Sequence, residues 1–393
     1  MTENGSACAV VERDVRACAG AETARVADAG RAATTVVNLM PAYAEAPVAL
    51  WLARRDVDAA CARIAELAGA GELVVLVPEG DELAEALGGR LGGVARVVGC
   101  DASLGFAYGN EGAVESLLAG TRLLPDGPAG PRAWGRVLAG SELLGEDGRR
   151  WVWPEGASEP VELARETSPA ALAEALGVSD AKAVYQGFPV CEFYAGDASE
   201  PVGLASDYVR VYTEKSCMAN ALSEVCQKSR RETCGRCVFG HEGGHQLATI
   251  MADVCRKKGH GGDLELLRDL LPVMGAQSLC EQGSALARAA SSCIALFGDE
   301  IERHYTRKVC PAGECKAYMT YHVLPAKCVG CGECVEACEE DAIAGKPRFV
   351  HVIDQKACTQ CGACVSACDE GAIVMAGADK PRTPPRPIPC KRR

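Results

Sequence analysis

The pattern of apolar and polar positions changes several times along the chain. Between residues 57 and 100, two stretches with helical periodicity, VDAACARIAELAGA and DELAEALGGRL, alternate with two short β-branched runs, LVVLVPEG and ARVVG. Such alternation is typical of a layered α/β domain. Residues 126–157 are then rich in Gly, Pro and Trp, which indicates a domain boundary or a long connection.

Two further units follow this boundary. Residues 158–213 combine short strand-like runs, VELA, AKAVYQG and DYVRVYT, with a helical stretch, SPAALAEALG, and predict a small mixed domain. Residues 214–307 are mostly helical, because LELLRDLLPVM and SALARAASSCIALFGDEIERHY carry apolar residues at helical spacing. The end of the chain is rich in proline and basic residues, which predicts a disordered tail or a docking strand.

Composition narrows the classes of protein that need to be considered. A chain of 393 residues is long enough for several domains, and its 48% hydrophobic and 24% charged residues are ordinary for a globular protein. The net charge of −12 argues against nucleic acid as a partner. We expect no membrane span and no export, because no long apolar run and no leader pattern occurs.

The cysteines need a chemical explanation. There are 23 of them, far more than packing explains, and many are grouped as C-x2-C. In a chain without an export signal, this grouping indicates metal ligands in a reducing compartment rather than disulfides. We therefore expect a cytoplasmic protein.

Eight of the cysteines form an internal repeat with a period of 30 residues (358 − 328). Neighbouring Gly, Val, Ala and Ile positions recur with them, which indicates a duplicated half-domain. The first copy supplies Cys328, Cys331, Cys334 and Cys338, and the second copy supplies Cys358, Cys361, Cys364 and Cys368.

This spacing predicts two 4Fe-4S clusters. A C-x2-C-x2-C loop holds three corners of one cube, and in two-cluster ferredoxins the fourth cysteine comes from the other half. Zinc knuckles would have no use for the third and fourth cysteines of each run. We assign one cluster to Cys328, Cys331, Cys334 and Cys368, and the other to Cys358, Cys361, Cys364 and Cys338.

Acidic residues follow the last cysteine of each run. Glu339 follows Cys338 and Asp369 follows Cys368, where ferredoxins usually have proline. Negative charge near a cluster stabilises its oxidised form. We therefore predict low reduction potentials for both clusters, although these carboxylates could equally be solvent-facing charges.

A second cysteine-rich motif lies in the helical region. The segment ETCGRC ends at Cys237, is preceded by CM at 217 and 218, and is followed by SLC ending at Cys280. This pattern resembles the NADH-binding, flavin-carrying subunit of respiratory complex I and its relatives in bifurcating hydrogenases and NAD-linked formate dehydrogenases. In that family a helical bundle holds one 4Fe-4S cluster by C-x2-C-x2-C and a distant cysteine. Cys234, Cys237 and Cys280 match three of those ligands.

The third cysteine of the family motif falls on Gly240, which cannot coordinate iron. Three outcomes remain open: His241 or a nearby cysteine such as Cys226 replaces the ligand, the cluster has an open corner, or the cluster is lost. His241 also begins a formal H-E-x-x-H match that ends at His245, but two glycines within that turn disfavour a protease helix.

The resemblance continues upstream, from about residue 35. FAYGNEGAVESLLAG (106–120) resembles the family segment around Y-x-C-G-E-E-T-A, and TVVNLMPAYAEAP (35–47) lies where the family has an acidic V-V-N-x-D-E-x-E-P-G. The glycine-rich loop that cradles the flavin phosphate in that family has no match here. The sequence therefore predicts a degenerate flavin site in which FMN and NADH binding are lost.

A zinc site is a further candidate. His304, Cys310 and Cys315 have H-x5-C-x4-C spacing, and the segment CPAGEC resembles the junction before the ferredoxin domain of bifurcating hydrogenase subunits, where a structural zinc is found. Zinc needs four ligands, and either Cys217 or Cys293 could supply the last. The alternative is three reduced residues in a linker.

Together these patterns predict an α+β multidomain protein. Its function is predicted as an iron-sulfur electron-transfer subunit of a multi-subunit oxidoreductase, with a flavin, molybdenum or hydrogenase subunit or soluble ferredoxin as partner. The alternatives are a flavin-containing NADH dehydrogenase and a non-catalytic iron-sulfur sensor. The predicted segments are an N-terminal extension (1–34), a degenerate α/β domain (35–157), a β-grasp-like domain (158–213), a helical bundle (214–307), a cysteine-containing junction (308–325), a bacterial-type ferredoxin domain (326–375) and a disordered tail (376–393).

Overall fold

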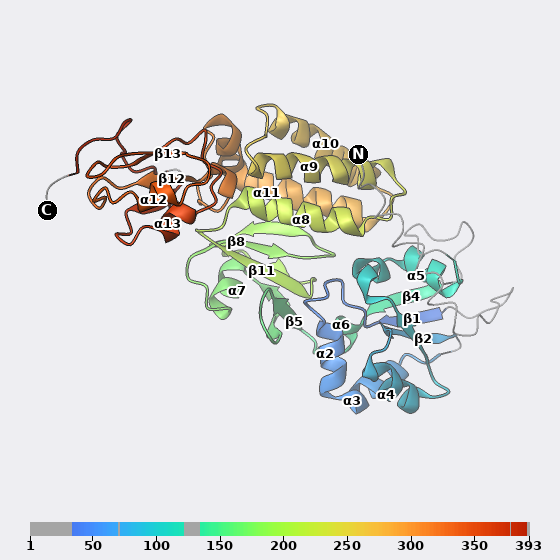
Figure 1. Cartoon of the computed structure of the whole chain (residues 1–393). Coiled ribbons are helices and arrows are strands. Elements are labelled where there is room, and N and C mark those ends of the chain that lie inside the picture. Colours follow the sequence, from blue (N-terminus) through green and yellow to red (C-terminus); the bar gives the residue numbers. More distant parts are fainter. Residues whose placement is uncertain (1–33, 70, 122–133, 378, 391–393) are drawn as a thin grey trace. The chain divides into compact units, whose positions relative to one another are not determined.

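The computed structural model describes residues 34–69, 71–121, 134–377 and 379–390 (Figure 1). These residues form two compact units. The first holds the described residues up to Glu214 together with 222–249 and 264–298, and the second holds 215–221, 250–263 and the residues from Asp299 onward. Almost all of the predicted N-terminal extension, with Cys8 and Cys18, lies outside the described residues.

The first unit opens with a four-stranded parallel sheet in the order β3-β2-β1-β4. The central strand β2 is a continuous apolar run, as expected for a strand covered on both faces. The strands are β1 (Thr34–Asn38), β2 (Leu73–Pro78), β3 (Arg96–Cys100) and β4 (Trp134–Ala139).

Helices cover both faces of this sheet, which confirms a mixed α/β fold with a parallel sheet. Val75 and Val77 pack toward one layer of helices, whereas Val74 and Leu76 pack toward the other, because side chains alternate along a strand. One layer comprises α2 (Val48–Arg55), α3 (Val57–Ala65) and α4 (Glu82–Leu91), and the other comprises the 3-10 helix η2 (Ala102–Gly109) and α5 (Glu111–Leu118).

A second, mixed sheet has the order β6-β5-β11-β8-β9. β5 and β11 are parallel neighbours and the other pairs are antiparallel, while helix α7 (Pro169–Ala175) packs on the core of this sheet. A small ribbon pairs β7 (Glu166–Thr167) with β10 (Val202–Gly203). The strands of the main sheet are β5 (Arg149–Pro154), β6 (Val161–Ala164), β8 (Ala181–Gln186), β9 (Glu192–Ala195) and β11 (Tyr208–Thr213).

The sheet pairing differs from the predicted domain boundary at residue 157. The Gly, Pro and Trp-rich stretch contains β4, which belongs to the first sheet, and β5, which belongs to the second. The second sheet therefore begins at Arg149. Local composition cannot reveal this, because strand pairing depends on partners distant in the sequence.

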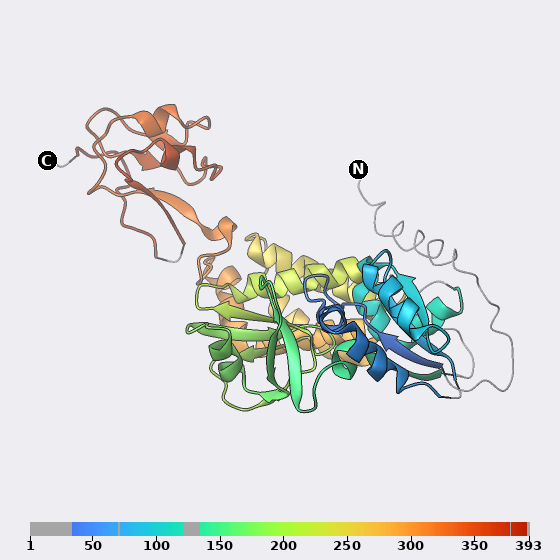
Figure 2. The ribbon, with the colours of Figure 1, turned by 90° about the horizontal axis from the view of Figure 1, so that it is seen from below.

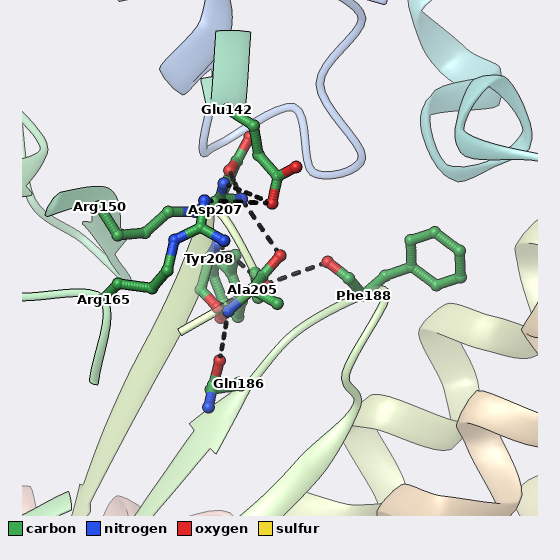
Figure 3. Close-up of polar contacts among 9 residues, drawn as sticks. Glu142, Arg150, Arg165, Gln186, Phe188, Ala205, Asp207 and Tyr208 are labelled. Atoms are coloured by element: carbon green, nitrogen blue, oxygen red, sulfur yellow. Dashed lines mark hydrogen bonds and ion pairs between the residues drawn. The ribbon is translucent and has the colours of Figure 1, made fainter. Parts of the chain in front are cut away.

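A buried ion pair lies beside the second sheet (Figure 3). The Arg150 side chain is 4% exposed and donates from Nη2 to Asp207 Oδ1 at 2.8 Å and to the Ala205 carbonyl at 3.1 Å. Glu142, in the short helix α6 (Gly140–Leu143), approaches the same guanidinium at 3.2 Å. The Asp207 carboxyl has its pKa raised by burial, which the neighbouring Arg150 charge partly offsets.

Helices dominate the chain from Met218 to Thr306 (Figure 1). A π-helical turn, η3 (Val238–Gly243), precedes α9, and such turns are frequent at functional sites. The longer helices are α8 (Met218–Glu232), α9 (Gly244–Cys255), α10 (Asp263–Gln277) and α11 (Glu281–Thr306).

The C-terminal region consists mostly of loops and repeats one small motif twice (Figure 2). Each copy has a short helix directly after a glycine in the left-handed conformation, at φ 100° for Gly332 and φ 84° for Gly362. The elements are β12 (Thr320–Val323) paired with β15 (Ile373–Ala376), β13 (Ile343–Ala344) paired with β14 (Val352–Ile353), and helices α12 (Glu333–Glu336) and α13 (Ala363–Ser366).

The tail differs from the predicted disordered segment. Val350 donates its backbone N–H to the Ile388 carbonyl at 2.8 Å, and Cys390 donates to the Arg348 carbonyl at 2.9 Å. Phe349 and Pro389 form an antiparallel bridge between these bonds. Residues 388–390 thus pair with residues 348–350 of the C-terminal region. Proline does not prevent this pairing, because it removes only its own backbone N–H donor.

Candidate iron-sulfur and metal sites

Two cavities in the C-terminal region gather the eight repeated cysteines. The first, of about 300 Å³, is lined by Cys328, Cys331, Cys334 and Cys368. The second, of about 330 Å³, is lined by Cys338, Cys358, Cys361 and Cys364. Each cavity therefore combines three cysteines of one copy with the last cysteine of the other copy.

The loop geometry explains this arrangement. The left-handed glycine before each short helix turns the chain so that the third cysteine points inward, and Cys334 is 5% exposed and Cys364 is 7% exposed. Both belong to one hydrophobic core. The second cysteines, Cys331 and Cys361, are exposed instead. Each cavity thus reaches from the shared core to the surface.

The donor set in these cavities fits an iron-sulfur cluster. Burial, reinforced by the neighbouring Cys328, Cys331 and Cys368, raises the pKa of Cys334 to about 12. Four thiolates held this close repel one another unless a cation compensates their charge, and the irons of a cluster supply that charge. The backbone N–H of Ala372 also points at Cys368 Sγ at 3.4 Å.

The carboxylates beside the cavities are not quite those that the sequence singled out. Glu370 lines the first cavity and Glu340 lines the second, whereas Glu339 and Asp369 are not among the lining residues. The acidic pair DE or EE after each cysteine therefore places its second member at the cluster.

A separate group of four ligands forms within the second unit. The ligand atoms of Cys217, His304, Cys310 and Cys315 all lie within 4.8 Å of one another, and all four residues are buried. Cys217 Sγ lies 3.3 Å from His304 Nε2 and 3.5 Å from Cys315 Sγ. Ligands around a tetrahedral zinc at about 2.3 Å for sulfur and 2.0 Å for nitrogen would be about 3.5 to 3.8 Å apart. The group includes Cys217 and not Cys293.

The surroundings of this group orient its ligands. His304 Nδ1 lies 3.0 Å from the Glu300 carbonyl, which fixes the tautomer that leaves Nε2 free to coordinate. Glu314 accepts the Cys217 backbone N–H at 2.6 Å. Hydrogen bonds from Cys217 and Cys315 lower the pKa of Cys310, and the hydrogen bond to Cys310 raises the pKa of Cys217.

The three central cysteines, Cys234, Cys237 and Cys280, lie close together, and the remaining ligand position of the family motif is occupied by Gly240. Cys234 and Cys237 are near enough for their charges to raise the pKa of Cys280, after the larger effect of burial. Gly240 donates its backbone N–H to Cys237 Sγ at 3.2 Å, and a Cβ at Gly240 would lie 2.6 Å from that sulfur. A cysteine at 240 would therefore not fit this backbone unchanged.

His241, which directly follows Gly240, is one of the replacement ligands that the sequence predicts. Its Cε1 lies 4.0 Å from the position of a Cβ on Gly235, so the ring leans over the loop between Cys234 and Cys237. Its buried Nδ1 has no hydrogen-bond partner. His241 belongs to the π-helical turn η3 whereas His245 belongs to α9, which separates the two histidines of the H-E-x-x-H match.

The residues where the sequence predicts a degenerate flavin site are held by their own contacts. Asn38 donates from its side chain to the Tyr108 carbonyl at 3.0 Å and accepts the Met40 N–H at 2.9 Å. A Cβ on Gly105 would lie 2.4 Å from the Pro41 carbonyl oxygen. At the start of α5, Asn110 caps the Ala113 N–H, which a bound phosphate would otherwise accept.

Sequence reasoning missed two residues beside the first cavity. His351 is 1% exposed, and its Nδ1 lies 3.8 Å from Cys328 Sγ. Cys390 packs against the same core as Cys328. The 30-residue period could have identified His351 from the sequence, because its counterpart in the repeat is Tyr321 (351 − 30), which lines the second cavity. Cys390 has no counterpart in the repeat, so only the fold reveals it.

Family comparisons agree with the two cysteine-rich regions. Residues 220–304 match the NADH-ubiquinone oxidoreductase-F iron-sulfur binding region, and residues 327–372 match a 4Fe-4S dicluster domain. The predicted resemblance to the flavin-carrying subunit is confirmed. The central helices are therefore similar to that family's iron-sulfur binding region, and the C-terminal region is similar to a 4Fe-4S dicluster domain.

Individual relatives point the same way. The chain is 34% identical over 141 residues to the HndC subunit of the NADP-reducing hydrogenase of Solidesulfovibrio fructosivorans, covering 36% of this chain and 29% of that one. It is 27% identical over 124 residues to the F subunit of the NADH-quinone oxidoreductase of Streptomyces coelicolor, covering 32% and 28%. The chain thus matches less than a third of the length of these relatives.

The fold is similar to a solved hydrogenase structure over a longer range. An NAD+-reducing NiFe hydrogenase in its H2-reduced state aligns with a TM-score of 0.58 at 16% identity, covering 76% of this chain and 59% of that chain. At this identity the likeness concerns the fold alone.

In the described part of the chain, no helix is both long and apolar enough to span a membrane.

Proposed function

We propose that this protein is an iron-sulfur electron-transfer subunit of a multi-subunit oxidoreductase. The observation that carries the proposal is the pair of cavities, each lined by three cysteines of one repeat and the last cysteine of the other. This donor set suits a 4Fe-4S cube, which exchanges one electron at a time. The ligands proposed for each cube are those predicted from the spacing.

The placement of the cysteines supports transfer between partners. Cys334 and Cys364 lie in one hydrophobic core, so both cubes would border the same packed interior. Cys331 and Cys361 are exposed, so one ligand of each cube would face solvent or a docked protein. An electron could then arrive at one cube and leave from the other. When bound, the clusters supply the redox chemistry, and the protein positions and shields them.

The partner belongs to the proposal as well. The matched relatives are described as one subunit of an NADP-reducing hydrogenase and one subunit of NADH-quinone oxidoreductase. We infer a flavin, molybdenum or hydrogenase subunit, or soluble ferredoxin, as the exchange partner. A reducing compartment such as the cytoplasm suits so many free thiols.

The α/β domain serves in this proposal as a scaffold without its own flavin. The glycine-rich phosphate loop is missing from the sequence, and the α5 N-terminus is capped by Asn110. The competing candidate is an NADH dehydrogenase with bound FMN, which the family match at residues 220–304 favours. A flavin absorbance peak together with NADH-dependent dye reduction would decide for that candidate.

Two further metal sites complete the proposal. Cys217, His304, Cys310 and Cys315 would hold a structural zinc, because their ligand atoms already have tetrahedral spacing. Cys234, Cys237 and Cys280 would hold a third iron-sulfur cluster with His241 as the fourth ligand. The support for His241 is its buried, unpartnered Nδ1 beside the cysteine loop.

The deciding experiment is anaerobic purification of the full chain, followed by iron, sulfide, zinc and flavin analysis and EPR of the dithionite-reduced protein. The proposal expects at least about eight irons per chain, with two interacting reduced cubes and no flavin. A protein that holds only zinc at the repeated cysteines would contradict it. A protein with clusters that no reductant reduces would favour a non-redox role.

A further inference from the structure

The two cluster cavities correspond to each other almost residue for residue. Beyond the cysteines, the residues that line the first cavity recur 30 positions apart in the second. The matched pairs are Ile353 with Val323, Glu340 with Glu370, Ala342 with Ala372, and Ile343 with Ile373, and Thr359 replaces Val329. Each cavity can therefore serve as the reference for the other. A lining residue without an equivalent in the other cavity gives the two sites different surroundings.

His351 breaks the correspondence. It lines the first cavity, where the repeat places Tyr321 in the second. The imidazole is 1% exposed, and Nδ1 lies 3.8 Å from the sulfur of Cys328. The ring fits because residue 345 is glycine: a Cβ there would lie 1.7 Å from Cδ2 of His351.

The environment of the ring selects one tautomer. Nε2 of His351 is buried and has no hydrogen-bond partner. A buried N–H without an acceptor is costlier and rarer than a buried lone pair without a donor. The proton therefore belongs on Nδ1, where it can be donated to Cys328 Sγ. Burial also lowers the pKa of His351.

Cys390 packs against the same hydrophobic core as Cys328 and is held there by backbone pairing. The tail is held by the Cys390 N–H bond to the Arg348 carbonyl and by the Val350 N–H bond to the Ile388 carbonyl. The Cys390 thiol therefore packs against the same core as the Cys328 side chain.

Among the described residues, no side chain donates a hydrogen bond to a cysteine sulfur of the second cavity, and the Thr359 hydroxyl makes none there. There, no cysteine sulfur lies within hydrogen-bonding distance of the Tyr321 hydroxyl, which instead lies against Gly362. Within the same described ranges, no tail segment pairs with the second copy in the way that residues 388–390 pair with the first. One acidic neighbour lines each cavity, Glu370 the first and Glu340 the second, so a nearby carboxylate does not by itself distinguish the two sites.

We propose that His351 donates a hydrogen bond to the ligand sulfur of Cys328, with the Cys390 thiol packed against the same core as a weaker contributor, and so makes the Cys328 cluster the more readily reduced of the two. The inference rests on the proposed function. Hydrogen bonds to cluster sulfurs stabilise the reduced state, which carries one more negative charge. An electron shared between the cubes then resides mainly on the first, and the second cube passes electrons toward it.

The test is an anaerobic redox titration followed by EPR on the full-length protein with its clusters loaded. The variants are His351→Phe, Cys390→Ala and, as the matched control in the other copy, Tyr321→Phe. His351→Phe is expected to lower the higher of the two potentials by about 59 mV, a tenfold change in the electron-exchange equilibrium between the cubes. Cys390→Ala is expected to lower the same potential by less, and Tyr321→Phe to leave it in place.

Several outcomes would overturn the inference. It fails if His351→Phe moves both potentials equally, moves the lower one, or moves neither. If His351→Phe does not retain its clusters, His351→Tyr introduces the residue that the other repeat already uses and must give the same shift. Iron analysis of each sample separates this question from the proposed function, because a chain that lacks two reducible cubes contradicts the function and not only the role of His351.

Discussion

The Nε2 atom of His304 lies 3.3 Å from the sulfur of Cys217, although 87 residues separate the two in the chain. Helix α8 begins directly after Cys217, and α11 carries His304 in its last turn. Cys310 and Cys315 follow on the loop after α11 and complete the group. One tetrahedral ion at this point would therefore tie the start of one helix to the end of another.

Substitution of a ligand in this group should abolish zinc binding. Cys310→Ser removes the thiolate that the neighbouring thiols stabilise, so zinc is expected to fall from about one per chain to a trace. Thermal unfolding of the variant should begin at a lower temperature. Cys61→Ser, the same change at a buried cysteine of α3, is the matched control and should keep its zinc. Equal zinc in both variants would rule the site out.

The Arg150–Asp207 ion pair predicts a stability effect. Asp207→Ala leaves the guanidinium buried with only the half-exposed Glu142 as a charged partner, which we expect to cost about 2 kcal/mol of unfolding free energy. The fluorescence of the tryptophans in β5 reports the unfolding of this sheet. The control is Arg149→Ala, which breaks an exposed ion pair to Glu162 and should cost under about 1 kcal/mol. If Asp207→Ala loses no more unfolding free energy than Arg149→Ala, the buried pair does not stabilise the fold.

Glu232 predicts a pH dependence. Burial raises its pKa from 4.5 to about 7, and Lys228 and Arg231 oppose this shift while Glu45 adds to it. The folded state holds the proton more tightly than the unfolded state, so stability from this group is full below about pH 4.5 and declines as the pH rises toward 7.

Glu232→Gln should remove this decline. Melting temperatures measured between about pH 5 and 8, values chosen to bracket the shift, are expected to fall with pH in the parent and to fall less in the variant. The gain at the upper end should approach about 3 kcal/mol at most. Glu265→Gln on the exposed side of α10 serves as control. Parallel pH profiles for the parent and Glu232→Gln would contradict the assignment.

The central cluster gives a prediction in iron content. If His241 is the fourth ligand, the parent should carry about twelve irons per chain and His241→Ala about eight. His245→Ala is the matched control, because His245 is the same residue type one turn further on and is also half-buried. A parent with only about eight irons would mean that the central site has lost its cluster and kept the helices.

The cysteine spacing alone predicted most of the residues on which the proposed function depends. A C-x2-C-x2-C loop is a local structure, so the chain itself presets three corners of each cluster site, and the 30-residue repeat supplied the fourth. The helical and strand-like segments were also readable, since their periodicity is local. The boundary at residue 157 stays a prediction, and local composition does not show that β5 pairs with β11, which lies more than fifty residues away.

What the sequence determined by itself was the chemistry that short-range spacing encodes: two ferredoxin cysteine runs, a family motif in the helices and a set of metal-ligand residues. Only the tertiary structure chose Cys217 over Cys293 beside His304, because residues on separate helices meet through packing. It also brought His351 and Cys390 to Cys328, and so gave two cluster sites with nearly identical local sequences different surroundings. Spacing along the chain sets ligands within a loop, whereas the field around a cluster depends on every segment that folds against it.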